Sequence, residues 1–422
     1  MIFNSSKYNS HWQDKELSDL GSFRRGKSRH RPRNDPDIFK NGVYPLIQTG
    51  EIKQANLYID SHNSCYNDLG LLQSKLWPKN TLCITIAANI AETALLGYPM
   101  CFPDSVVGFN AYQDESSELF MHYVFTYIRK AIQNSASGSI QDNINIDYLT
   151  SLKFKVPLKI YQDKVVSVLS ALDKKIDLNN RINAELEAMA KTLYDYWFVQ
   201  FDFPDANGKP YKTSGGKMVY NPILKREIPA GWEVGSASKL FYFNPTTPLT
   251  IGCFASYVDM DSLPVKGFMT KKIQKKMFTG GTKFIRNDVA VARITPCLEN
   301  GKTGLISRLK EGEVGFGSTE FIILRGKEFP LSGFGACLAR SDSFRQYAIS
   351  NMTGTSGRKR IESKILETYN LPIPSKNLLM KFENTVKPFF DIMTSKSIEN
   401  DELAALRDWL LPMLMNGQVT VK

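Results

Sequence analysis

The most regular pattern in the chain is a stripe of apolar positions between residues 161 and 198. Apolar or small residues recur there at alternating spacings of four and three, the heptad spacing of helices that pack along one face. No Pro or Gly interrupts the segment, so we expect one long helix. The stripe consists of Val165, Leu169, Leu172, Ile176, Asn179, Asn183, Leu186, Ala190, Leu193 and Trp197.

A second stripe of this kind lies near the end of the chain, where it can serve as the partner that the first helix needs. We predict that the two helices pair antiparallel and that Asn400 then faces Asn179 and Asn183. Buried Asn residues in such a stripe fix the register of the pair. The second stripe consists of Phe382, Val386, Phe389, Met393, Asn400, Leu403, Leu410 and Leu414.

The two halves of the chain repeat the same order of motifs. The segment GWEVGSASKLF around Trp232 matches HWQDKELSDLG around Trp12, and Trp409 matches Trp197. Such self-similarity predicts an internal duplication. We therefore predict an α+β fold with two tandem globular α/β domains, separated by two long antiparallel helices that form a coiled coil, with a pseudo-twofold internal repeat. The expected globular domains are residues 1–157 and 201–374, and the expected helices are 158–200 and 375–422.

Shorter patterns place further elements in the first half. Apolar runs bounded by turn residues predict strands within Asn41–Ile52 and Lys79–Ala87. Apolar residues at helical spacing predict a helix over Glu118–Gln133, and a short strand is expected to end at Pro157. The long helix should begin after that proline.

The charge balance favours a polyanionic partner. Lys and Arg total 53 against 42 Asp and Glu, which gives a net charge of +11 and is typical of nucleic-acid-binding proteins. One basic cluster lies in the first half, a second at a comparable place in the second half, and a third beside small residues. A single cluster is more often a solvated face, but recurrence in both copies favours DNA binding. The candidate DNA-binding residues are Arg24, Arg25, Lys27, Arg29, Arg31, Arg33, Lys271, Lys272, Lys275, Lys276, Lys283, Arg358, Lys359 and Arg360.

Catalytic chemistry finds little support in the sequence. Pro36-Asp37 followed by Glu51-Ile52-Lys53 fits the pattern of a PD/ExK nuclease, but Asp37 lies in a polar turn and the second half has no match. The six cysteines are scattered without a CxxC pair, which argues against zinc and is typical of a reducing cytoplasm. We expect no catalytic residue, metal ligand or cofactor, and no apolar run approaches the ~20 residues of a membrane span.

Several motifs, in order across both halves, resemble the specificity subunit of Type I restriction-modification enzymes. In the first half, ITIAANI and FPDSVVGF are similar to its target-recognition domains. The remaining matches are ELEAMAKTLYDYWFVQFDFPDANGKPYKTSGGKMVYN (185–221), IPAGWEV (228–234), ARITPCLENGKTG (292–304), GFGSTEFIILR (315–325) and LRDWLLPMLMNGQVTV (406–421).

The resemblance implies a non-catalytic subunit with two target-recognition domains, each reading half of a bipartite double-stranded DNA target. It also implies that the long helices separate these domains and dock two methyltransferase subunits, which methylate adenine, while a motor-nuclease subunit joins for restriction. The apolar candidates for partner binding are Trp197, Phe198, Trp409, Leu410 and Leu411. Two alternatives stay open: a PD/ExK-type metal-dependent nuclease, and a structural adaptor with incidental positive charge.

Overall fold

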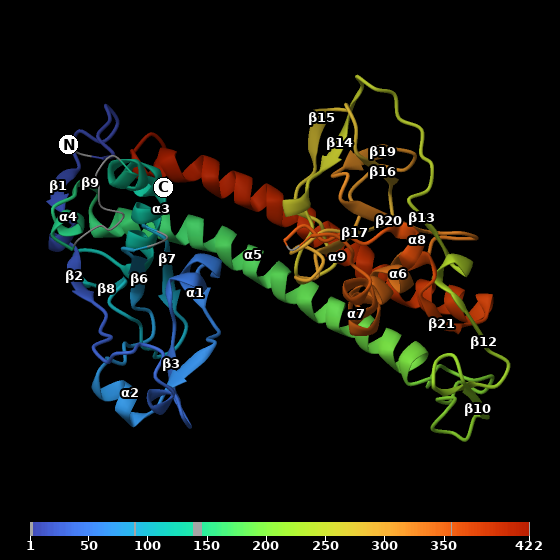
Figure 1. The fold of residues 1–422 in the computed structure, drawn as a ribbon. Helices are drawn as coiled ribbons and strands as arrows, with labels where there is room; N and C mark the ends of the chain where they lie inside the picture. Colours follow the sequence, from blue (N-terminus) through green and yellow to red (C-terminus); the bar gives the residue numbers. More distant parts are fainter. Residues whose placement is uncertain (1–2, 88–89, 138–145, 356, 422) are drawn as a thin grey trace. The chain divides into compact units, whose positions relative to one another are not determined.

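The computed structural model describes residues 3–87, 90–137, 146–355 and 357–421. The chain forms two compact units, each of which includes part of both long helices (Figure 1). The first unit comprises Met1–Asp177 and Glu402–Lys422, and the second comprises Leu178–Asp401. Helices and sheets both contribute to each unit, so the fold is mixed α and β. No helix in the described ranges is long and apolar enough to cross a membrane.

The first unit is built on a five-stranded sheet in the order β2-β8-β6-β7-β4, antiparallel except between β4 and β7. All four residues of β6 are buried, because Leu82 and Ile84 face the apolar cluster under α3 while Cys83 faces a second cluster. The elements of this unit before the long helix are β1 (Gln13–Glu16), β2 (Gly21–Arg25), β3 (Tyr44–Leu46), α1 (Thr49–Gln54), β4 (Tyr58–Ile59), β5 (Ser64–Tyr66), α2 (Asp68–Leu72), β6 (Leu82–Thr85), β7 (Thr93–Leu96), β8 (Val106–Ala111), α3 (Glu118–Ser137), α4 (Ile146–Thr150) and β9 (Lys153–Val156).

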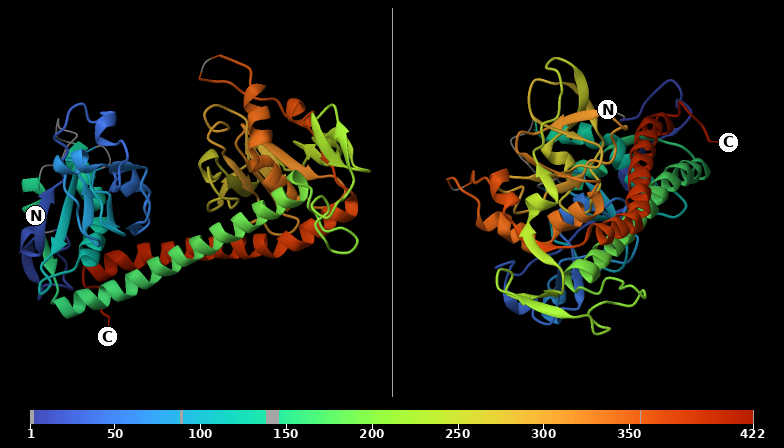
Figure 2. Two further views of the ribbon diagram at one scale, coloured as in Figure 1. Left: turned by 90° about the horizontal axis from the view of Figure 1, so that it is seen from below. Right: turned by 90° about the vertical axis from the view of Figure 1, so that its right-hand side faces the viewer.

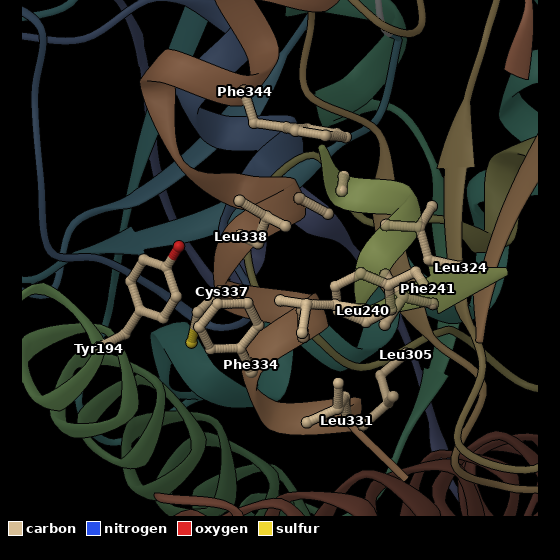
Figure 3. Packing of buried hydrophobic residues seen from close by; sticks show 14 of the residues in the cluster. Tyr194, Leu240, Phe241, Leu305, Leu324, Leu331, Phe334, Cys337, Leu338 and Phe344 are labelled. Atoms are coloured by element: carbon tan, nitrogen blue, oxygen red, sulfur yellow. The ribbon is translucent and has the colours of Figure 1, made fainter. Parts of the chain in front are cut away.

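The second unit holds two four-stranded sheets, in the orders β13-β20-β17-β18 and β15-β14-β19-β16. Its core joins the first of these sheets to α6 and to the long helices; Tyr194, for example, packs against Phe334 and Cys337 of α6 (Figure 3). The elements between the long helices are β10 (Met218–Asn221), β11 (Arg226–Pro229), β12 (Glu233–Ser236), β13 (Phe241–Phe243), β14 (Phe254–Val258), β15 (Gln274–Met277), β16 (Thr282–Ile285), β17 (Val289–Ala292), β18 (Thr303–Leu305), β19 (Val314–Gly317), β20 (Phe321–Gly326), α6 (Ser332–Arg340), α7 (Asp342–Ser350), α8 (Ser363–Glu367) and β21 (Asn370–Ile373).

The two units share a strand order. The run β2-β8-β6-β7 of the first unit has the same connectivity as β13-β20-β17-β18 of the second. In addition, β1 pairs antiparallel with β9 just before the first long helix, as β12 pairs with β21 just before the second. The units differ in what is added to this frame. The first adds the β3–β5 pair with α1, whereas the second adds the β15-β14-β19-β16 sheet.

The long helices are α5 (Lys159–Tyr194), which continues into a π turn at Asp195–Val199, and α9 (Lys376–Met415). Within the first unit, the early turns of α5 lie beside the last turns of α9, where Val165 and Leu169 share a core with Leu411 and Leu414 (Figures 1 and 2). Within the second unit, the end of α5 packs against the beginning of α9, where Trp197 lies 5.7 Å from Phe382 between ring centroids.

Polar contacts join the two helices in the second unit. Asn179 is fully buried and its Nδ2 donates to Oδ1 of Asn400 at 2.9 Å, while Nδ2 of Asn400 donates to Asn180 at 2.8 Å. Asn183 donates to Oγ of Ser397 at 3.2 Å. The expected contact of Asn400 with Asn179 is therefore present, whereas Asn183 pairs with a residue that the sequence did not single out.

One stretch of the first unit differs from the expected strand. Asn41–Ile52 was expected to contain only strand, but β3 covers Tyr44–Leu46 and helix α1 begins at Thr49. The helix forms because Glu51 closes its first turn, with its carboxylate accepting the N–H of Gln48 at 3.1 Å.

Candidate nucleic-acid interface

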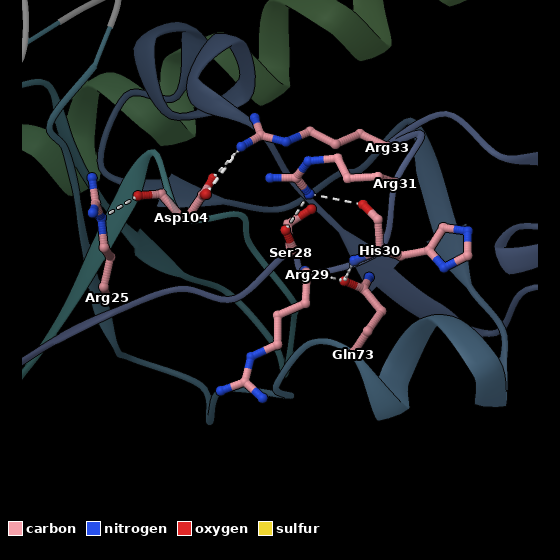
Figure 4. A network of polar contacts seen from close by, with 8 residues as sticks. All are labelled: Arg25, Ser28, Arg29, His30, Arg31, Arg33, Gln73 and Asp104. Carbon is pink, nitrogen blue, oxygen red and sulfur yellow. Dashed lines mark hydrogen bonds and ion pairs between the residues drawn. The ribbon is translucent and has the colours of Figure 1, made fainter.

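The basic segment 24–33 of the first unit is held in a fixed conformation. Its two outer arginines both reach Asp104: Nη2 of Arg33 lies 2.9 and 3.0 Å from the carboxylate oxygens, and Nε of Arg25 donates to the carbonyl at 2.7 Å (Figure 4). Gly26 lets the chain pass close to the neighbouring turn, because a Cβ there would lie 2.3 Å from the carbonyl oxygen of Pro103. Arg25 and Arg33 therefore anchor the segment.

A second group of contacts fixes the middle of the segment. Oε1 of Gln73 accepts the backbone N–H groups of Arg29 at 2.6 Å and His30 at 3.1 Å (Figure 4). Nη1 of Arg31 donates to the carbonyl oxygens of Ser28 and His30 at 2.7 and 2.8 Å. These bonds order the backbone while leaving the Arg29 side chain outside them, so the segment presents a defined surface.

The remaining cations of this segment form a group without anions. Within the described ranges, the side chains of Arg24, Lys27 and Arg29 have no hydrogen-bond or ion-pair partner. Lys75 belongs to the same positive region: partial burial, followed by repulsion from Arg24 and Lys27, lowers the pKa of Lys75. Its Nζ lies 3.8 Å from the centre of the Trp77 ring. Cations gathered without a counter-ion are suited to phosphate oxygens.

Lys75 was not among the residues selected from the sequence. In QSKLWPKN the next basic residue, Lys79, lies four positions later, so Lys75 is outside any run of basic residues and charge density along the chain gives no signal. Its proximity to Arg24 and Lys27 arises only from the fold. An aromatic residue two positions later was the one available hint, because a lysine can stack on an indole ring.

The second unit carries its lysines on and around strand β15. Lys275 pairs with Glu313 at 2.6 Å, and Glu313 also accepts from Oγ of Ser256 at 2.6 Å. Partial burial acts to raise the pKa of Glu313, but these hydrogen bonds prevail and lower it to about 2. Lys276 lies over the Tyr257 ring at 4.0 Å, and Lys283 over the Phe278 ring at 5.5 Å.

The cations with free side chains in this unit lie outside those contacts. Lys271 and Lys272 precede β15 and have no ion-pair or hydrogen-bond partner through their side chains in the described part of the chain. The same holds for Arg358 and Lys359, whereas Arg360 is tied to Glu320 through its Nε at 2.9 Å. The candidates thus separate into residues that fix loops and residues that remain available.

The expected correspondence between the first two basic clusters is wrong. By strand order, β2, which carries Arg24 and Arg25, corresponds to β13 and not to β15 or β16. Lys275, Lys276 and Lys283 lie instead on the added β15-β14-β19-β16 sheet. An inserted sheet changes the spacing along the chain, so similar positions in sequence do not imply similar positions in the fold.

Three of the apolar partner-binding candidates are buried inside their own units. Trp197 and Phe198 are each 6% exposed, and the Phe198 ring lies 5.0 Å from that of Phe382. Leu411 is also buried, and Leu410 is partly buried against the same core. These side chains close the units around α5 and α9, so the expectation of free apolar surface is wrong for Trp197, Phe198 and Leu411. Trp409, by contrast, is 58% exposed.

The two acidic residues of the nuclease pattern lie in different kinds of local structure. Glu51 accepts from Gln48 and from Nδ2 of Asn63 at 2.8 Å, and it lies on helix α1 instead of a strand. Asp37 lies in a short 3-10 turn, where its N–H donates to Asp35. Within the described ranges, no group of His, Cys, Asp and Glu is arranged to hold a metal ion. The geometry therefore gives no support to metal-dependent cleavage.

Comparison with known proteins gives one consistent result. Residues 9–188 match the model of the Type I restriction modification DNA specificity domain. The Type I restriction enzyme MjaIX specificity subunit of Methanocaldococcus jannaschii is 22% identical, over 97% of this chain and 94% of that protein. The EcoAI specificity subunit of Escherichia coli is 30% identical, over 43% of this chain and 31% of that protein.

A solved structure has the same fold. The S subunit of a Type-I restriction-modification system from M. genitalium superposes with a TM-score of 0.56 at 16% identity, over 98% of this chain and 99% of that one.

Proposed function

We propose that this chain, which belongs to the specificity-subunit family of type I restriction-modification enzymes, reads a bipartite DNA target with one recognition domain in each unit. It is the subunit that recognises DNA, and catalysis resides in other subunits. The proposed recognition domains are residues 1–157 and 201–374, and the proposed connecting helices are 158–200 and 375–422.

The observation that carries this proposal is that the two units share a strand order but place their basic residues on different elements. Both units use the same strand order, but Arg24, Lys27 and Arg29 lie on β2 and its following segment in the first unit, whereas Lys271 and Lys272 lie just before β15 in the second. Two domains with the same strand order can bind DNA in a similar manner, while their different surfaces contact different bases. This favours two half-sites of unlike sequence.

The available cations are the proposed phosphate contacts. In the first unit they are Arg24, Lys27, Arg29 and Lys75, and in the second Lys271, Lys272, Arg358 and Lys359. The anchored residues Arg25, Arg31, Arg33, Lys275 and Arg360 act by holding the loops in place. Each anchored residue already has a partner in the protein. Removing its side chain should therefore disturb the loop geometry more than the neutralisation of DNA phosphates.

The long helices are proposed to set the distance between the half-sites as a coiled coil. The buried Asn179 and its contact with Asn400 favour a single register, since a one-step slip would break the hydrogen bond from Nδ2 of Asn179 to Oδ1 of Asn400. A fixed register is what a separation device requires, and it fits a pseudo-twofold arrangement of the repeated units.

The proposed partners are two methyltransferase subunits, which would methylate adenine, and a motor-nuclease subunit for restriction. Trp409 is the candidate for their docking, because its indole is 58% exposed on α9 although the matching Trp197 is buried.

The test is to co-express the chain with the subunits encoded beside it and to sequence methylated adenines genome-wide. A split motif with two specific halves supports the proposal, whereas a continuous motif, or DNA binding without any sequence preference, contradicts it. A Lys75→Ala variant should weaken binding to all duplexes alike, because a phosphate contact carries no sequence information. Lys217→Ala, just before the separate β10–β11 hairpin, is the control and should leave binding unchanged.

A further inference from the structure

Strands β14 and β15 of the second unit form an antiparallel ribbon (Figure 1), and this ribbon presents apolar side chains to solvent. Phe254 of β14 lies directly opposite Met277 of β15, so both side chains point to the same face of the ribbon. Phe254 is 70% exposed and Met277 is 51% exposed, and Ile251 just before β14 is 76% exposed. Neighbouring exposed residues of this size mark a binding surface more often than single ones do.

The backbone at this end of the β14–β15 ribbon is ordered by hydrogen bonds and packing. Beyond the Phe254–Met277 pair, the N–H of Phe278 donates to Cys253 and the N–H of Gly252 donates to Phe278, both at 2.8 Å. Phe278 packs in a buried cluster with Ala255 and Phe316. The backbone that carries Phe254 is therefore fixed by hydrogen bonds and by a core beneath it.

The charges around this apolar group select the kind of partner. On β15, Lys275 lies on the same face of the strand as Met277 and Lys276 lies on the opposite face, while Lys271 and Lys272 lie just before the strand. Lysines on an edge strand protect it from pairing with other chains, but that role does not require exposed Phe, Met and Ile beside them. An apolar protein surface would have to desolvate the lysines, whereas duplex DNA offers phosphates to the lysines and stacked bases to the ring.

We propose that Phe254, supported by Met277, inserts as a wedge at a base step of the half-site that the second unit reads. Lys271 and Lys272 would hold the flanking phosphates while the ring separates two stacked base pairs. DNA-bending proteins commonly use Phe, Met or Ile in this way, and the energy of unstacking depends on the base step. The wedge would thereby add sequence preference at a position with no hydrogen bond to a base. This inference rests on the proposed function.

The test uses the full-length chain with its modification subunits and a duplex that carries the methylation motif. 2-Aminopurine, placed at successive positions of each half-site, reports unstacking by a rise in fluorescence. The wild-type protein should give a rise at one step of one half-site. Phe254→Ala should abolish that rise and weaken binding roughly 5- to 100-fold, the range expected for losing one aromatic contact with a base. Phe254→Trp should retain it.

Two comparisons make the result decisive. Tyr220→Ala removes another exposed aromatic residue, 63% exposed on the β10–β11 hairpin, and should leave both binding and fluorescence unchanged. Wild-type fluorescence in Phe254→Ala would overturn the wedge. So would a variant that retains DNA binding but no longer associates with the modification subunits, because the surface would then belong to a protein partner. Failure of the proposed function is distinct: the wild-type chain would then show no sequence preference at all.

Discussion

Removal of the unpaired cations of the first unit tests the division between anchoring and phosphate-contacting residues. The variant combines Arg24→Ala, Lys27→Ala and Arg29→Ala, whose side chains have no hydrogen-bond or ion-pair partner within the described residues. The fold should therefore be unaffected, and the melting temperature should stay the same or rise slightly as repulsion on Lys75 is relieved.

The expected loss of affinity follows from counterion release. Each phosphate contact contributes about 0.9 to the slope of log K against log salt, so the loss of three contacts should lower the slope by about 2.7. At 0.1 M salt, relative to 1 M, this corresponds to an affinity loss of roughly 500-fold. The assay is fluorescence anisotropy with a target-bearing duplex at several salt concentrations.

The matched control is Arg33→Ala. Arg33 is paired with Asp104 in an ion pair that is partly exposed, and such pairs contribute about 0–1 kcal/mol. We expect this variant to bind more weakly through a less ordered loop but to keep the wild-type salt slope. An unchanged slope in the triple variant, or an equal fall in slope for Arg33→Ala, would refute the division.

Two further predictions concern stability. Asp173 is 9% exposed, accepts from Tyr123 at 2.6 Å and pairs with Arg407 at 2.8 Å, and Arg407 also pairs with Asp408 at 2.8 Å. Asp173→Ala should destabilise the first unit by about 1–3 kcal/mol in urea unfolding, because the hydroxyl of the buried Tyr123 loses its acceptor; an unchanged urea midpoint would contradict this. Burial raises the pKa of Glu383 to about 7, although the N–H groups of Phe334 and Gly333 act against the shift. Because this pKa is higher in the folded state than in the unfolded state, Glu383 contributes most to stability at low pH, and the second unit should lose stability as the pH rises from 4.5 to about 7. Glu383→Gln should flatten that dependence in urea midpoints measured at pH 5 and pH 8. Parallel pH profiles of variant and wild type would count against it.

The long helices were the part of the fold most open to prediction from sequence. The stripe of α5 contains no Pro or Gly and predicts a helix by itself, whereas the helical stripe of α9 continues across Pro388 and Pro412; both helices cover most of the expected ranges. The partner of Asn179 was also predictable, because a buried amide needs another polar group in the same seam. The helix at Thr49–Gln54 was missed, since it depends on a side-chain cap from Glu51 that competes with the apolar pattern of a strand.

The binding surface was less predictable, because it depends on which residues the fold brings together. The candidates are runs of charge, a criterion that cannot distinguish Arg33, which is bound to Asp104, from Arg29, whose side chain has no partner among the residues that the structure describes. The criterion also omits Lys75, which lies outside any run of basic residues. Trp197 and Trp409 occupy matching places in the repeat, but only the first is covered by its unit. Burial of that kind is a tertiary property.

The most direct test of the account changes the length of the helices and reads the methylation motif. Four residues would be inserted into α5 after Asp177, with a matching insertion into α9 after Asp401, where the two units divide. The added ~6 Å of helix corresponds to about two base pairs of duplex. We predict that both specific halves of the motif stay the same while the spacer between them lengthens by about two base pairs. Methylation that persists with an unchanged spacer would contradict the claim that these helices set the separation.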